Sequence, residues 1–443
     1  MYHPRQDSSA PPRTIFDLTG GEPLRLPALP GETSSDVAIV GGGLVGCSAA
    51  LHLAEMGRSA IVIEANEIGW GSARRSAGQV SASATKLDPA EVLRVYGPVH
   101  GPRLNEAGAQ APEFVSALAE RYGMDISIVR GGILRGVHTP AMAAKLRGQA
   151  EFWQRQGAPV EYLSRGEAAR IIGSDFYLGA QIDRRGIAVN PLAWVRGLAR
   201  AAMSLGARLH ENTRMDGLTR TADGWRIATP HGAISAGQVL LCTNAYTDDA
   251  WPGLKRTIIP VRGYQIWTRP LGDNVRAHIL RGIAAMNDTR RLLTGMRLYP
   301  DGRLHFSGGV GFGAERAPDL EDRIARVRQI LPDVGPLEVE GWWSGWVTRG
   351  IADGWRLHRL APGLFTAIAC NGRGVAMGPI MGRELARCAA GVPESELLVP
   401  LSAPKSIPWH PVHALLGSMA IRHYARLDRR EIAEMRSIAD TPA

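Results

Sequence analysis

Cysteine and lysine are scarce in this chain of 443 residues, which has only four of each. The four cysteines form no CxxC pair, so neither a disulfide framework nor a cysteine-based metal site is indicated. His410 and His413 are the closest pair of histidines; we expect them to be solvated and predict no metal. The N-terminus has no apolar stretch of the kind found in signal peptides, which together with the cysteine usage predicts a cytoplasmic protein.

Long apolar runs are absent too. No run approaches the roughly 18 residues that a transmembrane helix needs, so no transmembrane segment is predicted. Basic residues number 51 against 42 acidic ones, a net charge of +9. They are spread along the chain and form no RNA-reading module, which argues against a nucleic-acid partner. The 45% hydrophobic content is ordinary for a globular protein, and the length allows two intertwined domains.

Three glycines follow an apolar, strand-like run at 37–40 in the pattern Gly41-x-Gly43-x-x-Gly46. Gly41 permits a tight turn, Gly43 lets the backbone approach a pyrophosphate, and Gly46 lets the next helix pack closely on the strand. A helical pattern at 44–54 comes next, and its N-terminus would favour the negative charge of a phosphate. This arrangement predicts a dinucleotide site.

A second apolar run at 61–63 ends at Glu64, 18 residues after Gly46. Glu64 is placed to accept hydrogen bonds from ribose hydroxyls, and its charge would repel a 2′-phosphate. Strand, glycines, helix, strand and acid therefore arrive in the expected order. An NAD-dependent dehydrogenase would carry the same fingerprint and is one alternative.

The loop at 67–79 is small, polar and basic, and Ser72 or Arg75 would meet a phosphate there. It resembles the flavin-contacting loop of the D-amino-acid-oxidase-like superfamily of FAD-dependent amine oxidoreductases, and within it the gamma-glutamylputrescine oxidoreductase group, whose loop usually reads GASGRNGGQ. The positions that fit this pattern are Gly71, Arg75, Gly78 and Gln79, and those that depart from it are Arg74, Ser76 and Ala77.

The resemblance continues in order along the chain, through segments at 185–191, 239–246, 260–265, 296–304 and 371–377. It implies a mixed α/β (α+β) fold. A Rossmann-like FAD-binding domain would be assembled from discontinuous segments, with an inserted antiparallel-sheet substrate domain and a C-terminal helical tail.

The expected partition has four parts: an N-terminal arm at 1–35, an FAD-binding domain at 36–87, 161–254 and 336–397, a substrate domain at 88–160 and 255–335, and a tail at 398–443. The arm is rich in Pro, Gly and Ser, so we expect it to lie on the surface or to be partly disordered. Helical patterns are expected at 113–120 and 320–331. In the tail, an amphipathic helix docked on its own protein is favoured over a membrane-surface helix.

The resemblance implies oxidation of the C–N bond of an amine or amino acid. Hydride would pass to flavin N5, and the imine would hydrolyse to a carbonyl compound and an amine. FAD is predicted to be non-covalent, because 66–82 contains no histidine and 255–335 no cysteine. Polyamine-derived, secondary-amine (sarcosine- or opine-like) and D-amino-acid substrates remain open, as do oxygen or another electron acceptor and a homo-oligomeric state. A non-catalytic or RNA-associated flavoprotein is a further alternative.

Four residues are candidates for catalysis or substrate binding. Arg373, in a glycine turn before a helix, would stabilise negative charge on the reduced flavin, and the fork of Arg297 would hold a substrate carboxylate. On a strand, Tyr264 is preferred to Gln265 for the side facing the flavin, and Trp346 would belong to an aromatic box for a cationic amine. Core packing is the alternative for both aromatic residues. For Arg373 the alternative is a surface arginine that its neighbouring glycines make conspicuous, and for Arg297 a surface ion pair on a hairpin.

The remaining candidates are cofactor contacts that follow from the fingerprint and the resemblance: Gly41, Gly43, Leu44, Val45, Gly46, Glu64, Ala65, Gly71, Ser72, Arg75, Ser76, Ala77, Gly78, Gln79, Met215, Thr243, Gly372, Arg373, Gly374, Val375 and Ala376. The loop at 348–356 departs from the family, which often has a proline and an acid there. For this reason gamma-glutamylputrescine itself is not carried over as the substrate.

Overall fold

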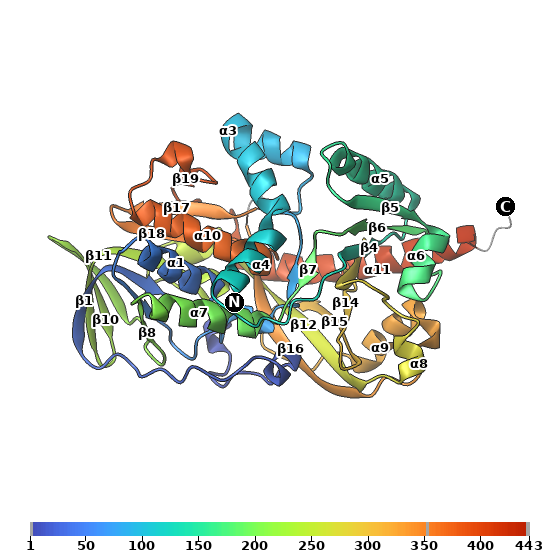
Figure 1. Cartoon of the computed structure of the whole chain (residues 1–443), viewed down its shortest axis with the longest axis horizontal. Coiled ribbons are helices and arrows are strands. Elements are labelled where there is room, and N and C mark those ends of the chain that lie inside the picture. The colour runs from blue at the N-terminus through green and yellow to red at the C-terminus, as the bar shows by residue number, and fades with distance from the viewer. Residues whose placement is uncertain (1–2, 351–353, 440–443) are drawn as a thin grey trace.

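A nine-stranded sheet is organised around a parallel core. The computed structural model describes residues 3–350 and 354–439, and this sheet lies on the left of the view in Figure 1. Its main path runs β19-β17-β18-β11-β1-β2-β8, with the β9–β10 hairpin extending it beside β11. The strands are β1 Glu32–Val40, β2 Ala60–Ile63, β8 Arg208–His210, β9 Gly217–Thr221, β10 Gly224–Thr229, β11 Gly232–Leu241, β17 Arg356–Ala361, β18 Leu364–Ile368 and β19 Leu401–Ser402.

The predicted strand–helix–strand unit at 36–64 is confirmed. β1 and β2 pair in parallel, and both are fully buried from Val37 and from Ala60 onward, as expected for strands covered on both faces. Helix α1 (Leu44–Glu55) joins them and packs on α7 (Pro191–Ser204) and α10 (Gly374–Ala389). Figure 1 shows these three helices together against the sheet.

An eight-stranded sheet forms the other half of the molecule, in the order β16-β12-β15-β14-β13-β4-β6-β5. Its strands are β4 Ile133–Gly136, β5 Val160–Ser164, β6 Gly179–Asp183, β12 Ile259–Pro270, β13 Ala285–Asp288, β14 Met296–Leu298, β15 Arg303–Gly311 and β16 Val339–Arg349. All neighbours are antiparallel except β13 and β4, which are parallel.

The remaining elements connect or cover the sheets. A short pair, β3 (Gln79–Val80) and β7 (Ile187–Ala188), lies between them. The other helices are α2 Ser72–Arg75, α3 Pro89–Ala109, α4 Ala111–Arg121, α5 Pro140–Gln154, α6 Arg165–Ile172, α8 Asp273–Arg276, α9 Leu320–Ile330 and α11 His413–Ala439. The 3-10 turns are η1 Pro4–Gln6, η2 Ile15–Leu18, η3 Asn244–Tyr246, η4 Leu254–Thr257, η5 Pro332–Val334, η6 Glu394–Glu396 and η7 His410–Val412.

Sheet membership differs from the expected partition at two places. The ranges 161–254 and 336–397 were expected to lie with the cofactor domain. The eight-stranded sheet nevertheless includes β5, β6, which ends at Asp183, and β16 at 339–349. The physical reason is that alternation of side chains identifies a strand but not its partner.

The N-terminal arm is docked, which corrects the expectation of partial disorder for the described residues from 3 onward. Ile15 and Phe16 are buried, and the backbone oxygen of Phe16 accepts a hydrogen bond from Asn190 Nδ2 at 2.8 Å. The ring of Phe16 meets Trp343 of the eight-stranded sheet edge-on at 5.6 Å. Residues 1–2 lie outside the described part of the chain.

The tail is the predicted amphipathic helix, α11, and it docks on its own protein. Ile432 and Met435 are buried on one side, whereas Leu415 and Met419 near its start are exposed. In Figure 1 the helix lies behind the eight-stranded sheet and runs from the centre of the view toward the right. Within the described residues, no helix has both the length and the apolar content to cross a membrane.

Candidate functional site

A cavity of about 990 Å³ lies between the carboxyl ends of β1 and β2 and one face of the eight-stranded sheet. Most of the residues predicted to contact a cofactor line it. These are Gly41, Gly43, Leu44, Val45, Glu64, Ala65, Gly71, Ser72, Arg75, Ser76, Ala77, Gln79, Met215, Thr243, Gly372, Arg373, Gly374, Val375 and Ala376. Gly46 and Gly78 are not in the lining.

The glycines of the β1–α1 turn have three different environments. Gly41 has a φ of 111°, and a Cβ there would lie 2.9 Å from the carbonyl oxygen of Cys242, so the turn requires glycine. A Cβ on Gly46 would overlap the carbonyl oxygen of Gly41, which explains why Gly46 supports close packing. A Cβ on Gly43 would meet no protein atom within 4 Å, because it would project into the cavity.

Glu64 anchors the same turn. Its Oε2 accepts a hydrogen bond from the N–H of Gly42 at 2.8 Å, and its Oε1 accepts one from Asn66 at 3.0 Å. Burial raises the pKa of this carboxyl group, and the backbone N–H bonds oppose that shift. Each oxygen keeps a further lone pair for the hydroxyls of a ribose. The start of α1, the open space at Gly43 and Glu64 together fit the pyrophosphate and ribose of FAD.

Buried donors without a partner also point to a missing ligand. Among the described residues, Arg297 Nε, Trp70 Nε1 and the hydroxyl of Tyr246 are buried and have no hydrogen-bond partner, and all three residues line the cavity. An unpaired buried polar group costs roughly 1–3 kcal/mol, so a bound molecule that accepts these hydrogen bonds would be stabilising. The residues present therefore fit a long, polar cofactor with an aromatic portion.

Ser72 and Arg75, the expected phosphate contacts, tie their loop to the protein. Ser72 Oγ donates to the backbone oxygen of Trp346 at 2.7 Å. The guanidinium of Arg75 lies 4.3 Å from the centre of the Trp70 ring and donates to the backbone oxygen of Trp70. Trp343 Nε1 donates to the backbone oxygen of Arg75 at 3.0 Å. Both side chains thus fix the cavity wall, whether or not they reach a ligand.

The cavity floor is the polar face of the eight-stranded sheet. Across the strands, Arg135 stands between Gln181 and Asn287, and Ser307 stands beside Gln265. All five line the cavity. The residues next to them in sequence point the other way into an apolar core: Leu134, Ile182, Ile266, Met286 and Phe306. The alternation of a strand thus separates a buried core from a polar ligand wall.

Neutral hydrogen bonds join the floor to the cofactor loop. Asn287 Nδ2 donates to Gln79 Oε1 at 2.7 Å, and Gln265 Oε1 lies 2.8 Å from His305 Nε2. Burial and the nearby charge of Arg297 lower the pKa of His305 to about 3. His305 is therefore neutral near pH 7 and donates its Nε2–H to Gln265.

The expected orientation of Tyr264 is corrected. A register shift in the β12–β15 pairing falls between Tyr264 and Gln265. Gln265 faces the cavity, whereas the ring of Tyr264 packs 6.3 Å from that of Trp342 and is not in the lining. Strand alternation predicted that the two residues face opposite sides, and the structure decides which side is which.

The structure brings Arg297, Arg373 and Trp346 into the same cavity. Arg297 Nη1 donates to the backbone oxygen of Val189 at 2.8 Å. The indole of Trp346 donates to Asp7 at 2.7 Å, and the guanidinium of Arg262 lies 4.1 Å from its ring centre. Arg262 therefore packs over the Trp346 ring, which lines the cavity wall.

Arg373 precedes α10 and contacts neutral oxygens. Its Nη1 donates to Ser81 Oγ at 3.3 Å, and its Nε to the backbone oxygen of Thr85 at 3.4 Å. Burial, together with the charges of Arg135 and Arg349, lowers the pKa of Arg373 to about 10. The group remains a cation near pH 7 and is well placed to attract an anion. Of the atypical loop at 348–356, residues 351–353 lie outside the described part of the chain.

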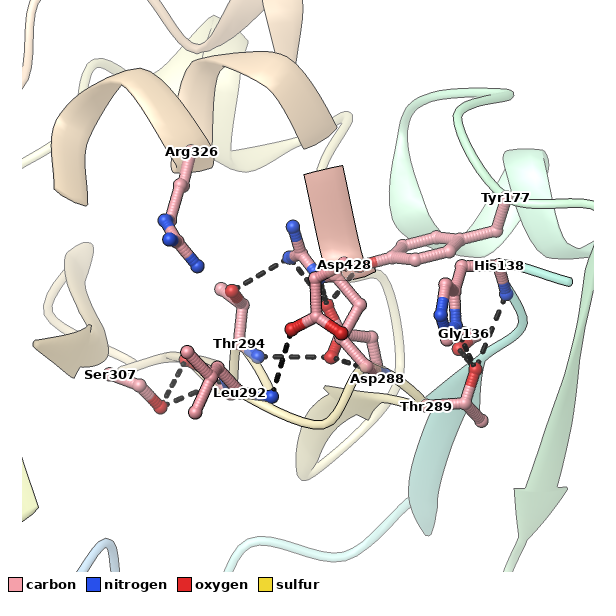
Figure 2. A network of polar contacts seen from close by, with 12 residues as sticks. Gly136, His138, Tyr177, Asp288, Thr289, Leu292, Thr294, Ser307, Arg326 and Asp428 are labelled. Carbon is pink, nitrogen blue, oxygen red and sulfur yellow. Dashed lines mark hydrogen bonds and ion pairs between the residues drawn. The ribbon is translucent and has the colours of Figure 1, made fainter. Parts of the chain in front are cut away.

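Figure 2 shows a polar network that holds the β13–β14 loop, which forms part of the cavity wall. Asp428 of α11 accepts hydrogen bonds from the N–H groups of Arg291 and Leu292 at 3.1 and 2.9 Å. His138, Asp428 and Glu431 offer ligand atoms within 4.8 Å of one another. Glu431 is paired with Arg291 at 2.6 Å and with His138 at 3.0 Å, so protein groups already use this cluster and it carries no metal assignment.

The other predicted histidine pair also has protein partners. His410 Nε2 contacts the backbone oxygen of Ile258, and His413 Nε2 that of Pro408, each at 2.8 Å. Sequence reasoning did not select Arg135, Asn287 and His305 as site residues. Their signal was the polar member of each alternating pair in the strands at 133–136, 285–288 and 303–311.

Comparison with known proteins agrees with this geometry. A family model described as FAD dependent oxidoreductase (DAO) matches residues 36–388. The probable oxidoreductase OrdL of Rhizobium meliloti (strain 1021) is 28% identical over 428 residues, which cover 96% of this chain and 99% of that protein. The gamma-glutamylputrescine oxidoreductase of Escherichia coli (strain K12) is 28% identical over 359 residues, which cover 80% and 84%.

Two solved structures share the fold. Glycine oxidase from Geobacillus kaustophilus matches with a TM-score of 0.69 and 24% identity, over 81% of this chain and 95% of that one. Iminodiacetate oxidase from Chelativorans sp. BNC1 matches with a TM-score of 0.68 and 22% identity, over 84% and 100%.

Proposed function

The chain belongs to the DAO family of FAD-dependent oxidoreductases, and we propose that it uses non-covalent FAD to oxidise the C–N bond of an amine or amino acid. The imine formed from the substrate then hydrolyses to a carbonyl compound and an amine. The single observation that carries this proposal is one cavity that joins a dinucleotide cradle at Gly43 and Glu64 to a polar wall bearing Arg297. FAD, when bound, supplies the acceptor for the hydride.

We further propose that one sheet binds the cofactor and the other binds the substrate. The nine-stranded sheet with α1 and α10 holds the dinucleotide, because the glycine turn and Glu64 lie at the ends of its parallel strands. The eight-stranded sheet holds the substrate, because its polar face forms the cavity floor. In this proposal Tyr264, which packs on Trp342 outside the cavity lining, has a packing role, and Trp346 remains a candidate wall for the substrate amine.

Residues of the chain bind and orient the substrate. The free Nε–H of Arg297 would donate to a carboxylate, and the buried cation Arg373 would hold an anion or stabilise negative charge at the cofactor ring. His305, neutral and bonded to Gln265, offers no proton at neutral pH. The buried cationic surroundings also favour the deprotonated, reactive form of a substrate amine.

The alternative is a dehydrogenase of D-amino acids or secondary amines that passes electrons to an acceptor other than oxygen. The names of the relatives include a gamma-glutamylputrescine oxidoreductase and glycine oxidases, so both linear amines and small amino acids belong in the first panel. Comparing oxygen consumption with the reduction of an artificial electron acceptor separates an oxidase from a dehydrogenase.

The first experiment is an absorbance spectrum of the purified protein, recorded before and after anaerobic addition of amines and amino acids. We expect a flavin spectrum that bleaches with one substrate class, and release of FAD on denaturation. A flavin spectrum that none of the amines bleaches would contradict the proposed reaction. A protein that gains no flavin absorbance with added FAD would contradict the cofactor assignment.

A further inference from the structure

Arg135 is a cavity-lining cation that forms no ion pair with a carboxylate of the described residues. In the described part of the chain, no carboxylate oxygen lies within ion-pair distance of it, and its one hydrogen bond goes to the neutral Gln149 Oε1 at 3.3 Å. It extends from the polar face of β4, between Gln181 and Asn287. A largely buried guanidinium whose one hydrogen bond goes to an amide is poorly satisfied, because the more distant charge of Asp88 only partly compensates for taking its charge out of water.

The acids of the eight-stranded sheet that line this cavity are paired with other cations. Asp183 pairs with Arg185 at 2.7 Å, and Asp288 with Arg290 at 2.5 Å. Nearby, outside the cavity lining, Asp88 pairs with Lys145 at 3.2 Å. Among the described residues, the charge of Asp88 acts on Arg135, but the two form no ion pair.

Other cations gather at the same end of the cavity. Lys86 and Lys145, two of only four lysines in the sequence, line the cavity, and so does Arg373. The charge of Arg135 helps to lower the pKa of Arg373, so the two guanidiniums lie near one another. Gln149 and Asn105, which are neutral and polar, complete this end between α3 and α5. The surroundings favour an anion with polar edges.

Resting on the proposed function, we propose that Arg135 forms a second anion subsite, which binds a carboxylate of the substrate remote from the C–N bond that is oxidised. Arg135 and Arg297 lie on strands that are two steps apart in the sheet, β4 and β14 with β13 between them. Neighbouring strands are about 4.8 Å apart, so the backbones of the two strands that carry these cations are roughly 10 Å apart across the sheet. The substrate class is therefore an amine that carries an anionic group at its far end, or an amino acid with a second carboxylate.

The test measures binding of redox-inert probes to the FAD-loaded enzyme and needs no known substrate. Glutarate, adipate and suberate are compared with their monoamides, by calorimetry and by perturbation of the flavin absorbance. We expect the best dicarboxylate to bind at least tenfold more tightly than its monoamide. Arg135→Gln should abolish that advantage, since it removes the cation and keeps a polar side chain.

Arg130→Gln is the matched control, because Arg130 is exposed, lies five residues away in sequence and is not in the cavity lining. It should keep the full tenfold advantage. If Arg135→Gln does not fold, Arg135→Lys decides: it keeps the charge but loses the bidentate fork, so the advantage should fall several-fold. An advantage that is equal in the parent and in either Arg135 variant overturns the subsite, as does the absence of any preference for dicarboxylates.

The outcomes separate this inference from the proposed function. Amines that bleach the flavin without any dicarboxylate preference would leave the function standing and remove the subsite. If the preference for dicarboxylates depends on Arg135 but no amine bleaches the flavin, the anion subsite would stand and the proposed function would be contradicted.

Discussion

Gly43 and Gly46 are three positions apart, and substitutions at the two positions test different properties of the same turn. We expect Gly43→Ala to fold normally, because its Cβ would meet no protein atom within 4 Å. It should weaken FAD binding by tenfold or more, because the Cβ would occupy the space for the pyrophosphate. Gly46→Ala should destabilise the protein itself, since its Cβ would overlap the carbonyl oxygen of Gly41. Thermal unfolding without FAD and titration with FAD distinguish the two effects. Normal FAD affinity in Gly43→Ala would refute the cradle.

His305 gives a pH dependence whose sign can be stated. Its pKa is about 3 in the folded protein against an ordinary value of 6.5, so between these values the unfolded chain binds the proton and the folded protein does not. As pH falls through this window, His305 lowers the free energy of unfolding by about 1.4 kcal/mol per pH unit.

Replacement by glutamine removes that contribution. In urea titrations between pH 6 and pH 4, the free energy of unfolding of His305→Gln should fall less steeply than that of the parent, by about 1.4 kcal/mol per unit. His231→Gln, at an exposed position, should follow the parent. Parallel curves for the parent and His305→Gln would show that the buried ring takes up its proton without penalty.

At this scale the sequence identified the turn residues that line the cavity, but not the residues of the sheet that line it. Gly41, Gly43 and Glu64 belong to one local unit, whose spacing alone fixes their positions relative to a dinucleotide. Arg135 and Asn287 are 152 positions apart and meet only because β4 and β13 pair. The strand pattern revealed their alternation, but not which face would become the cavity floor.

At the scale of elements, α11 acts on the cavity through one carboxylate. Asp428 accepts hydrogen bonds from the N–H groups of Arg291 and Leu292, in a loop that lines the cavity (Figure 2). We expect Asp428→Ala to loosen this loop, because two part-buried amides lose their acceptor, at a cost of roughly 0.5–1.5 kcal/mol each. Hydrogen exchange of the peptide covering 289–295 should speed up by at least tenfold.

Glu434→Ala provides the control for that measurement, since Glu434 lies on the same helix in an exposed pair with Arg430. Exposed pairs of this kind contribute little, so exchange at 289–295 should stay at the parent rate. Equal protection of the loop in Asp428→Ala and in the parent would mean that α11 merely rests on the sheet.

Helices were easier to predict than sheet partners. The helical patterns at 113–120 and 320–331 correspond to α4 and α9, because the 3.6-residue period is a local property. The sheet to which β5, β6 and β16 belong depends instead on neighbours far along the chain. The same limit explains why the sequence partition and the sheet membership differ at these three strands.

For the molecule as a whole, the N-terminal arm links the two sheets. His3 contacts the backbone oxygen of Thr247, beyond the end of β11, at 2.9 Å. Asp7 pairs with Arg262 of β12 at 2.6 Å and accepts a hydrogen bond from Trp346 of β16 at 2.7 Å. Because the arm is rich in proline, glycine and serine, composition left open whether it lies on the surface or is partly disordered. The outcome depends instead on a few anchors that no periodicity reveals, Phe16 and Asp7 among them.

The arm should therefore contribute to stability and to cofactor retention together. Arg262 is 1% exposed, and Asp7→Ala would remove its nearest carboxylate, leaving the more distant and half-exposed Glu315 at 3.8 Å. Breaking a buried pair in this way costs about 3 kcal/mol. Because Arg5, Asp7 and Ser9 also line the cavity, loosening the arm should increase FAD release as well.

Asp273→Ala is the control and should change neither property, because the carboxylate of Asp273 is 90% exposed in a pair with Arg276. Thermal unfolding with and without added FAD gives both numbers. A large loss of stability with unchanged FAD release would mean that the arm braces the two sheets but forms no part of the cofactor enclosure.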